Sequence, residues 1–386
     1  MSAPATCRWG ILSTGWIAGM FVKDLLVDPE TRGVRDIKHE VVAIGSRSVE
    51  SAQQFVNQWW PDVDSNAHKR IKRHGSYAEL FRDQAVDCIY IGTPHSHHFD
   101  TAYAALQAGK NVLVEKPMTV NAKQAETLVR LAREKGVFLA SALWTRCLPS
   151  TLKLQEVLAS GAIGEIRGVT SEFSIDATGL VNRDPGHRMV NPELAGGALL
   201  DLGPYSYTQL ALVLAPHGRT SYDKLPEISS SMVKTSTRVD ASTTATLHFE
   251  QSDGRIVAGT MTSAIDRHTP PERCVLISGS LGYITIHSPA NNPRSFTVKR
   301  YGDSHRFWTH ETEHDATTYN FGMPGGIFGF AYEADEVARC MRDGKTESEL
   351  LPLDETVYQM KIFDEIRRQN RLEYPAPIES FDVSSL

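Results

Sequence analysis

The chain has 386 residues, of which 41% are hydrophobic and 22% are charged, and its formal net charge at pH 7 is −6. This length predicts two domains, and the composition is typical of a soluble globular protein. The negative charge excludes a general attraction to nucleic acid or to an anionic membrane surface.

No membrane span, secretory signal or disulfide framework is predicted. The sequence has no run of about 18 apolar residues, and its N-terminus lacks a basic region followed by an apolar stretch. None of the five cysteines stands in C-x-x-C spacing, so we expect reduced thiols and no zinc site. The sequence therefore predicts a cytoplasmic protein.

The first predicted strand, Arg8–Leu12, runs through a glycine-containing turn into a helix. The turn reads Ser13-Thr14-Gly15-Trp16-Ile17-Ala18, which is the G-x-G-x-x-G/A dinucleotide pattern with serine in place of the first glycine. Gly15 would let the backbone approach a pyrophosphate, and the helix N-terminus offers N–H groups to phosphate. Taken alone, the turn is equally compatible with an ordinary strand–helix connection, and Ser13 leaves the tightness of the turn open.

The second predicted strand, Val41–Ile44, is followed by Gly45-Ser46-Arg47-Ser48. Sites that prefer NAD usually place an acid here to bind the ribose 2′-hydroxyl. Instead, Arg47 can pair with a 2′-phosphate, and Ser46 adds a neutral donor, which favours NADP. The alternative is a solvated surface arginine. The polar stretch Asp28 to His39 is interpreted as a surface insertion.

Two further strand ends carry polar residues. The strand Cys88–Ile91 ends in Gly92-Thr93-Pro94, and the strand from Asn111 ends at Glu115-Lys116-Pro117, where proline stops it. Ligands bind at the carboxyl ends of strands in open α/β sheets, so Lys116 is a candidate acid, base or pKa-tuning group. The repeated strand–helix units, with a last strand at Val137–Ala140, predict a doubly wound parallel sheet in a Rossmann domain over residues 1–143.

The second half of the chain has a different pattern. Short alternating segments predict strands at 242–249, 257–262, 275–278, 283–286 and 296–298, and two helices with apolar faces, 330–341 and 353–363, close the chain. We therefore predict an α+β domain with a large, open, mostly antiparallel sheet over residues 144–386.

The segment Gly196–Tyr205 opens an apolar helical stretch of this second domain. Asp201 and Tyr205 are four residues apart, so they face the same side if the helix begins at or before Asp201. A tyrosine beside a lysine is a usable acid–base pair, because the ammonium stabilises phenolate. Taken alone, the residues favour a plainer interpretation, an N-capping aspartate and a half-buried core tyrosine.

Taken together, these motifs resemble the glucose–fructose oxidoreductase / inositol dehydrogenase family over almost the whole chain. The motifs are the glycine turn, Thr93-Pro94-x-x-x-His98, Glu115-Lys116-Pro117, Gly196–Tyr205 and Gly329-Phe330-Ala331-Tyr332-Glu333. Many family members have histidine where this chain has Tyr205. The tyrosine and the segment Trp144-Thr145-Arg146 resemble the branch of dimeric dihydrodiol dehydrogenases and NADP-dependent D-xylose 1-dehydrogenases.

The resemblance implies a cofactor site and a substrate site. NADP would contact Ser13, Thr14, Gly15, Trp16, Ile17, Ser46, Arg47, Thr93, Pro94, His98, Glu115 and Lys116. The substrate would contact Trp144, Arg146, Asp176 and Tyr205. Asp176 follows a strand-like segment, 169–175, and could equally be a surface turn residue. The resemblance also implies a homodimer formed through the exposed face of the large sheet.

The implied reaction is oxidation of an aldopyranose, D-xylose in the first place, at the anomeric carbon to an aldonolactone. Tyr205 would accept the proton of the anomeric hydroxyl, Lys116 would hold that hydroxyl and lower the pKa of Tyr205, and Asp201 would orient Lys116 or a sugar hydroxyl. Two alternatives stay open: a trans-dihydrodiol dehydrogenase, and an NADP-binding regulator without catalysis. The presence of Lys116, Asp201 and Tyr205 together argues against the regulator.

Histidines gather in two places, residues 95–98 and 305–314. Neither group has the spacing of a metal site, and we predict no bound metal. The basic run His68–His74 is interpreted as a solvated loop or helix face.

Overall fold

The computed structural model describes residues 3–60, 70–215, 222, 224–302 and 313–383. The chain forms two compact units. The first, here called the Rossmann unit, comprises Met1–Trp144, Met323–Met360 and Ala376–Leu386. The second, here called the large-sheet unit, comprises Thr145–Gly322 and Lys361–Pro375.

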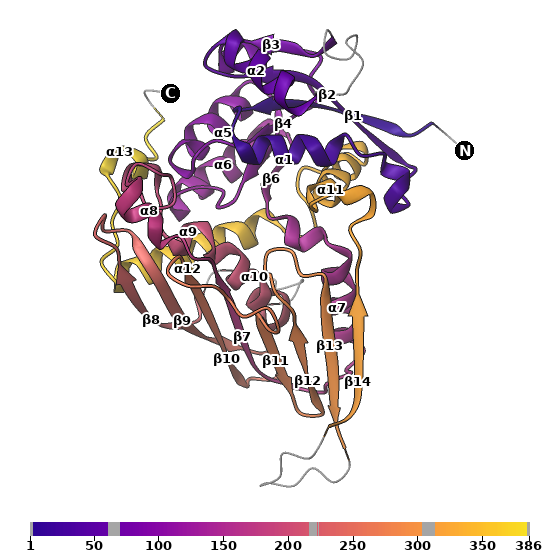
Figure 1. Ribbon diagram of the computed structural model, residues 1–386, viewed down its shortest axis with the longest axis vertical. Helices are drawn as coiled ribbons and strands as arrows, with labels where there is room; N and C mark the ends of the chain where they lie inside the picture. The colour runs from indigo at the N-terminus through magenta and orange to yellow at the C-terminus, as the bar shows by residue number, and fades with distance from the viewer. Residues whose placement is uncertain (1–2, 61–69, 216–221, 223, 303–312, 384–386) are drawn as a thin grey trace. The chain divides into compact units, whose positions relative to one another are not determined.

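The Rossmann unit is built on a six-stranded parallel sheet with the order β3-β2-β1-β4-β5-β6 (Figure 1). The strands are β1 Ala5–Leu12, β2 Ile37–Gly45, β3 Lys72–His74, β4 Cys88–Ile91, β5 Asn111–Glu115 and β6 Leu139–Ala142. All residues of β4, and most of β1 and β5, are buried, as expected where helices cover both faces of a parallel sheet. The predicted doubly wound sheet is confirmed.

Helices from both ends of the sequence surround this sheet. They are α1 Trp16–Leu25, α2 Val49–Trp59, α4 Tyr77–Arg82, α5 His98–Gln107, α6 Ala122–Lys135, α11 Phe330–Arg342 and α13 Ala376–Glu379, with the short turns η1 Pro29–Arg32, η2 His95–His97 and η5 Pro324–Gly326. Helix α11 packs against α1, β1 and β2. A late segment of the chain therefore completes the Rossmann unit.

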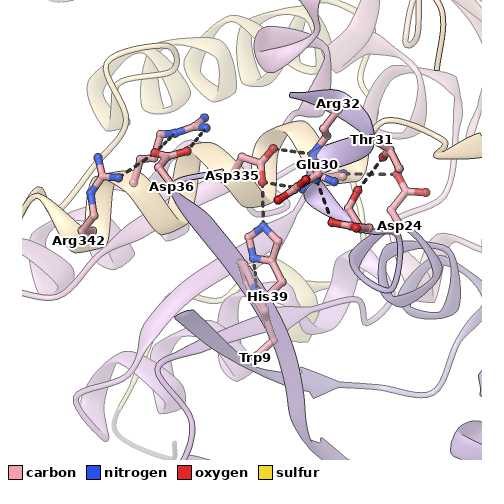
Figure 2. A network of polar contacts seen from close by, with 12 residues as sticks. Trp9, Asp24, Glu30, Thr31, Arg32, Asp36, His39, Asp335 and Arg342 are labelled. Atoms are coloured by element: carbon pink, nitrogen blue, oxygen red, sulfur yellow. Dashed lines mark hydrogen bonds and ion pairs between the residues drawn. The ribbon is translucent and has the colours of Figure 1, made fainter. Parts of the chain in front are cut away.

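The structure corrects the interpretation of one polar segment in this unit and limits that of another. The basic run includes β3, which pairs with β2 and whose Lys72 and His74 both contact Asp83, at 2.8 and 3.0 Å. The stretch Asp28 to His39 is not simply a surface insertion. It contains η1 and the start of β2, and the side chains of Arg32 and His39 are buried against Asp335 of α11 (Figure 2).

The large-sheet unit contains an eight-stranded sheet with the order β14-β13-β12-β11-β7-β10-β9-β8 (Figure 1). The strands are β7 Ile166–Ser174, β8 Glu227–Lys234, β9 Asp240–Glu250, β10 Ile256–Ala264, β11 Val275–Gly279, β12 Gly282–Ile286, β13 Ser295–Tyr301 and β14 Glu313–Asn320. Neighbouring strands are antiparallel except for the pair β7 and β10. The predicted large, mostly antiparallel sheet is confirmed.

The two faces of this sheet differ in composition. One face is apolar and is covered in part by α10 Gly203–Leu214, which contacts β7 and β10. The other face carries a row of mostly small polar side chains across the strands, interrupted by Leu276 of β11. The polar members are Ser229, Thr246, Thr260, Thr170, Thr285, Thr297 and Thr318. Hydroxyl pairs link neighbouring strands within this row, for example Thr246 with Thr260 at 3.1 Å.

The remaining helices are short, apart from the long α12. They are η3 Trp144–Cys147, α7 Pro149–Ala159, α8 Thr178–Arg183, η4 Pro192–Leu194 and α9 Ala198–Asp201, with α12 Leu353–Gln369 contributing to both units. Along the stretches that the structure describes, no helix combines the length and apolar character needed to cross a bilayer.

Candidate functional site

The turn after β1 shows how serine replaces the first glycine of the dinucleotide pattern. Ser13 adopts a positive φ of 90°, a conformation that usually requires glycine. Its hydroxyl donates to the carbonyl of Gly92 at 3.0 Å and accepts from the amide of Gly15 at 3.3 Å. Its amide donates to the carbonyl of Gly45 at 3.1 Å. These three bonds hold the turn tight and offset the strain, which is of order 1 kcal/mol.

No contact within the protein requires glycine at position 15. Its φ of −77° suits any residue, and an added Cβ would meet only Ser13 Oγ at 3.5 Å and Gly92 O at 3.9 Å. The space above Gly15 is therefore open to a ligand. Helix α1 begins directly after it, without a side-chain cap or an acid in its first turn, and Trp16 is 64% exposed. Free N–H groups at this helix end fit a phosphate.

The turn after β2 lies beside the turn after β1. The hydroxyl of Thr14 is 3.1 Å from the hydroxyl of Ser51 in the first turn of α2. Ser46 is buried and its amide donates to the carbonyl of His74 at 3.2 Å, whereas Arg47 is exposed. An exposed guanidinium at this strand end, with no acid in the turn, fits a ribose 2′-phosphate better than a 2′-hydroxyl.

His98 links the ends of β4 and β5. It is the first residue of α5 and is fully buried. Its Nδ1 lies 2.7 Å from the carbonyl oxygen of Pro117, and its Nε2 lies 2.9 Å from that of Thr93. Burial lowers the pKa of His98 to about 4, and the two carbonyl contacts act in the opposite direction. His98 thus fixes Thr93 and Pro94 relative to the segment that carries Lys116.

Glu115 and Lys116 stand at the end of β5, as the sequence predicts. Glu115 is the last residue of the strand and is buried, and Lys116 is half-buried. The Glu115 carboxylate accepts from the hydroxyl of Tyr90 at 2.7 Å and from the amide of Lys116 at 3.1 Å. The predicted cofactor residues of the Rossmann unit therefore share one edge of its sheet, at the carboxyl ends of β1, β2, β4 and β5.

The late motif Gly329–Glu333 also belongs to the Rossmann unit, at the start of α11. Asp24 of α1 caps this helix by accepting from the amides of Phe328 and Gly329, each at 2.7 Å. Glu333 is buried, and burial together with the charges of Glu115 and Asp24 raises its pKa well above the usual range.

Trp144 is buried between aromatic rings of the same unit. Its ring centroid lies 4.1 Å from that of Phe330 and 4.9 Å from that of Phe328. The other predicted substrate residues belong to the large-sheet unit. Arg146 is buried in η3, whereas Asp176 is exposed and accepts from the amide and hydroxyl of Thr178, at 3.0 and 2.7 Å. The contacts of Asp176 are those of a turn residue.

Asp201 and Tyr205 lie on consecutive helices rather than on one. Asp201 ends α9, and Tyr205 lies in the first turn of α10 after the connecting residue Leu202. Both are buried. Asp201 accepts from Arg188 at 3.0 Å, and the ring of Phe173 meets that of Tyr205 edge-on at 5.4 Å. The N-cap position of α10 is taken by Leu202, so the interpretation of Asp201 as an N-capping residue is wrong.

Two glycines let the chain before α9 approach closely. A Cβ at Gly196 would lie 2.6 Å from the carbonyl oxygen of Arg188, and Gly197 has a φ of 116°. The amide of Gly197 donates to the carbonyl of Met189 at 2.8 Å. This approach brings Arg188 to Asp201.

Lys116 lies in the Rossmann unit, and Asp201 and Tyr205 lie in the large-sheet unit, so their pairing stays a prediction. Sequence reasoning missed Phe173, Arg188 and Asp240, the last of which accepts from the amide of Leu199 at 2.7 Å. Arg188 precedes the glycine motif, and no sequence motif around it marked it as a functional residue. Phe173 lies in a strand-like segment, and its aromatic ring was the one available signal.

No group of three histidine, cysteine or acidic side chains in the described part of the chain could hold a metal ion. Residues 305 and 310 lie outside the described residues, and the same holds for the side chain of His314.

Two family models and several known proteins match this chain. Residues 7–143 match the model of an oxidoreductase family with an NAD-binding Rossmann fold, and residues 151–285 match the GFO/IDH/MocA C-terminal domain. The chain is 39% identical to D-xylose 1-dehydrogenase (NADP(+)) of Hypocrea jecorina, over 96% of this chain and 94% of that protein. It is 32% identical to trans-1,2-dihydrobenzene-1,2-diol dehydrogenase of Bos taurus, over 95% and 98% of the two chains.

A solved structure shows the same fold at low identity. It is the aldose-aldose oxidoreductase from Caulobacter crescentus complexed with glycerol, with a TM-score of 0.72 and 18% identity, covering 95% of this chain and 98% of that one.

Proposed function

Because this chain belongs to the GFO/IDH/MocA oxidoreductase family, we propose that it is an NADP-dependent sugar dehydrogenase that oxidises an aldopyranose, D-xylose in the first place. The carrying observation is the sheet edge of the Rossmann unit, where an open Gly15, an uncapped helix α1 and an exposed Arg47 lie together. That edge fits a dinucleotide with a 2′-phosphate. The 39% identity to an NADP-dependent D-xylose 1-dehydrogenase supports the sugar.

The proposed residues of the cofactor site have separate tasks. The amides at the start of α1 and the backbone at Gly15 bind the pyrophosphate, and Arg47 with Ser46 binds the 2′-phosphate. Thr93 and Pro94, held by His98, line the place of the nicotinamide beside Lys116. When bound, NADP supplies the hydride acceptor for the reaction.

In the proposed reaction, side chains of the protein take up the proton. Tyr205, as phenolate, accepts the proton of the anomeric hydroxyl while the C–H bond at the anomeric carbon breaks. Lys116 donates a hydrogen bond to the same hydroxyl, and its ammonium lowers the pKa of Tyr205 by favouring phenolate. Asp201, already oriented by Arg188, positions Lys116 or a sugar hydroxyl. The product is the aldonolactone.

A dihydrodiol is the second candidate substrate. The specific observation in its favour is the Phe173 ring against Tyr205, an aromatic neighbour that an aromatic diol would contact well. The relative from Bos taurus that is 32% identical is named for such a substrate.

The proposed partner is a second copy of this chain. The uncovered face of the large sheet, with its row of threonines, is the surface proposed for the dimer. Sedimentation of the chain and of Thr260→Lys would test this, since a lysine at the centre of the face should yield monomers. We also propose the cytoplasm as its location, which fits five cysteines that are all free thiols.

The test of function is NADPH formation with D-xylose, D-glucose and a trans-dihydrodiol, using NADP⁺ and NAD⁺ in parallel. Tyr205→Phe should lower kcat/KM by about 10³-fold, the usual scale for a general base, while NADPH binding persists. Tyr207→Phe, which removes another buried hydroxyl from α10, is the matched control and should retain activity. Tight NADPH binding without turnover of any substrate would leave only the non-catalytic regulator.

A further inference from the structure

Asp240 is a buried acid whose position the strand pattern does not predict. It is the first residue of β9 and has no exposed surface. Along β9 the inward-facing residues are Thr243, Ala245, Leu247 and Phe249. In the pairing with β8, Ser242 faces Val233 and Asp240 faces Lys234, so Ala241 is an extra residue on β9. A bulge of this kind reverses the alternation and turns Asp240 inward.

The carboxylate of Asp240 contacts the segment that precedes α9 and α10. Its Oδ2 accepts from the amide of Leu199 and from the hydroxyl of Thr243, both at 2.7 Å. Its Oδ1 has no hydrogen-bond partner and lies 2.1 Å from the place that a Cβ at position 197 would take, so only glycine fits there. Gly197 therefore presents a Cα–H group to this oxygen, a weak but attractive contact.

Both carboxylate oxygens of Asp240 therefore contact the segment around the start of α9. Leu199 lies in α9, whose last residue is Asp201, and the amide of Asp201 donates to the carbonyl of Gly197 at 3.2 Å. Asp240 thus grips the segment at Gly197 and Leu199, on either side of the start of α9. Tyr205 follows in the first turn of α10, and its amide donates to the carbonyl of Leu202 at 3.1 Å.

We propose that Asp240 is a positioning residue for Tyr205, the proposed proton acceptor, and for Asp201, because it holds Gly197 and Leu199 in the segment that leads to both. The catalytic part of this inference rests on the proposed function, whereas the structural part does not. Asp240 acts through the backbone of the segment, because the carboxylate of Asp201 is bound by Arg188 and not by Asp240.

Two cationic residues come from elements next to Asp240. Arg367 of α12 interacts with it electrostatically. Lys234 faces it across the β8–β9 pair, and the Lys234 ammonium donates to the carbonyl of Arg371 at 2.6 Å. Neither residue is hydrogen-bonded to the carboxylate, whose two full hydrogen bonds come from Leu199 and Thr243.

The test combines kinetics with hydrogen exchange on the full chain. We would compare the parent with Asp240→Ala, Asp240→Asn and the control Asp253→Asn, an exposed acid whose side-chain partner is Arg255. The readouts are kcat and KM for D-xylose, KM for NADP⁺, and amide exchange of a peptide covering 196–206. Exchange reports on the segment without requiring any turnover.

Asp240→Ala should lower kcat by roughly 100-fold, the cost of a small misplacement of catalytic groups. KM for NADP⁺ should stay at the parental value, because the cofactor residues lie in the other unit. Exchange over 196–206 should be faster. Asp240→Asn keeps an acceptor for Leu199 and should recover most of both losses, and Asp253→Asn should change neither readout.

A parental kcat in Asp240→Ala, or a lowered kcat with parental exchange over 196–206, would overturn the proposal. If the parent turns over no sugar or diol, the proposed function fails. Amide exchange in Asp240→Ala then tests the structural part alone. Faster exchange over 196–206 supports the proposal that Asp240 holds this segment, and unchanged exchange refutes it. If Asp240→Ala does not fold, Thr243→Val removes one donor and leaves the carboxylate in place. It should lower kcat several-fold and speed exchange, and parental values of both would refute the proposal.

Discussion

Arg32 and Asp335 lie 303 residues apart in the sequence and form two hydrogen bonds, each of 2.7 Å (Figure 2). Their side chains are 1% and 2% exposed. Asp335 also lies 2.9 Å from Nε2 of His39, whose Nδ1 is 3.1 Å from Nε1 of Trp9. Because the indole N–H of Trp9 can only donate, Nδ1 of His39 accepts and its Nε2 donates to Asp335. The network joins α11 to β1 and β2.

Arg32→Leu should destabilise the chain strongly. Burial by itself raises the pKa of Asp335, and the bonds from Arg32 and His39 bring it below the usual range. Removing the guanidinium leaves a buried carboxylate with one neutral donor, which typically costs about 3–5 kcal/mol. The free energy of unfolding in urea, measured at neutral pH, gives this value.

An exposed neighbour provides the control. Asp36 binds Arg339 and Arg342 at the surface, at 2.9 and 2.8 Å, and Arg339→Leu should cost at most about 1 kcal/mol. The double change Arg32→Leu with Asp335→Asn should recover part of the loss, since Asn keeps an acceptor for His39. Equal losses for Arg32→Leu and Arg339→Leu would refute the role given to the buried pair.

Gly15→Ala should weaken NADPH binding without unfolding the protein. The backbone at Gly15 suits alanine and the added Cβ makes only ordinary contacts, so the free energy of unfolding should fall by no more than about 1 kcal/mol. A methyl group would hold a pyrophosphate away, and we expect at least a tenfold loss of affinity, or about 1.4 kcal/mol. Fluorescence titration with NADPH measures it.

Gly109→Ala should give the opposite result. Gly109 has a φ of 75° and open space around it, so alanine there costs roughly 1 kcal/mol of stability through backbone strain alone. Its affinity for NADPH should be parental. Parental affinity in Gly15→Ala would contradict the placement of the pyrophosphate.

Arg47→Glu should shift the cofactor preference from NADP⁺ toward NAD⁺. The change removes the cation proposed for the 2′-phosphate and places an acid where NAD-selective sites have one. Hydrogen bonds to a charged group contribute about 1.5–3 kcal/mol, so kcat/KM for NADP⁺ should fall by about 10- to 100-fold. Arg82→Gln, a change of another exposed arginine, should leave the ratio of the two cofactors unaltered. An unchanged ratio in Arg47→Glu would show that Arg47 is a surface residue.

The fold could be predicted where burial imposes a strong pattern. The buried strands β4 and β5 and the alternating strand β9 were all recognised, with small shifts at their ends. The strands that were missed, β3, β8 and β14, all lie at an edge of their sheet. Edge strands carry polar side chains such as Lys72 and His74, so their composition resembles that of a loop.

The candidate site divides in the same way. Gly15, Lys116 and Tyr205 could be proposed from the sequence, because they lie in short motifs at strand or helix ends. The burial of Arg32 and His39 could not be predicted from the stretch around them, since their partner Asp335 comes from the far end of the chain. Asp240 was missed because the bulge at Ala241 reverses the alternation that a pattern assumes to be unbroken.

The stability of the chain should carry a pH dependence that comes from Asp240. Burial raises the pKa of this carboxyl to about 6, and the bonds from Thr243 and Leu199 lower it only in part. The folded pKa is thus above the unfolded value, near 3.9. The protonated carboxyl group of Asp240 therefore stabilises the folded chain fully below a pH of about 4. This stabilisation is lost as the pH rises through about 6, because ionisation of Asp240 favours the unfolded chain. Two pKa units correspond to about 3 kcal/mol.

Asp240→Asn should remove this dependence, because the amide does not ionise. Between pH 4 and pH 7, the parent should therefore lose up to about 3 kcal/mol of unfolding free energy relative to Asp240→Asn. Asp253→Asn, an exposed acid whose pKa is lowered by its bonds to Arg255, should show no such gain. Urea unfolding at several pH values measures all three chains. A difference between Asp240→Asn and the parent that stays constant with pH would mean that Asp240 ionises in the folded chain as easily as in water.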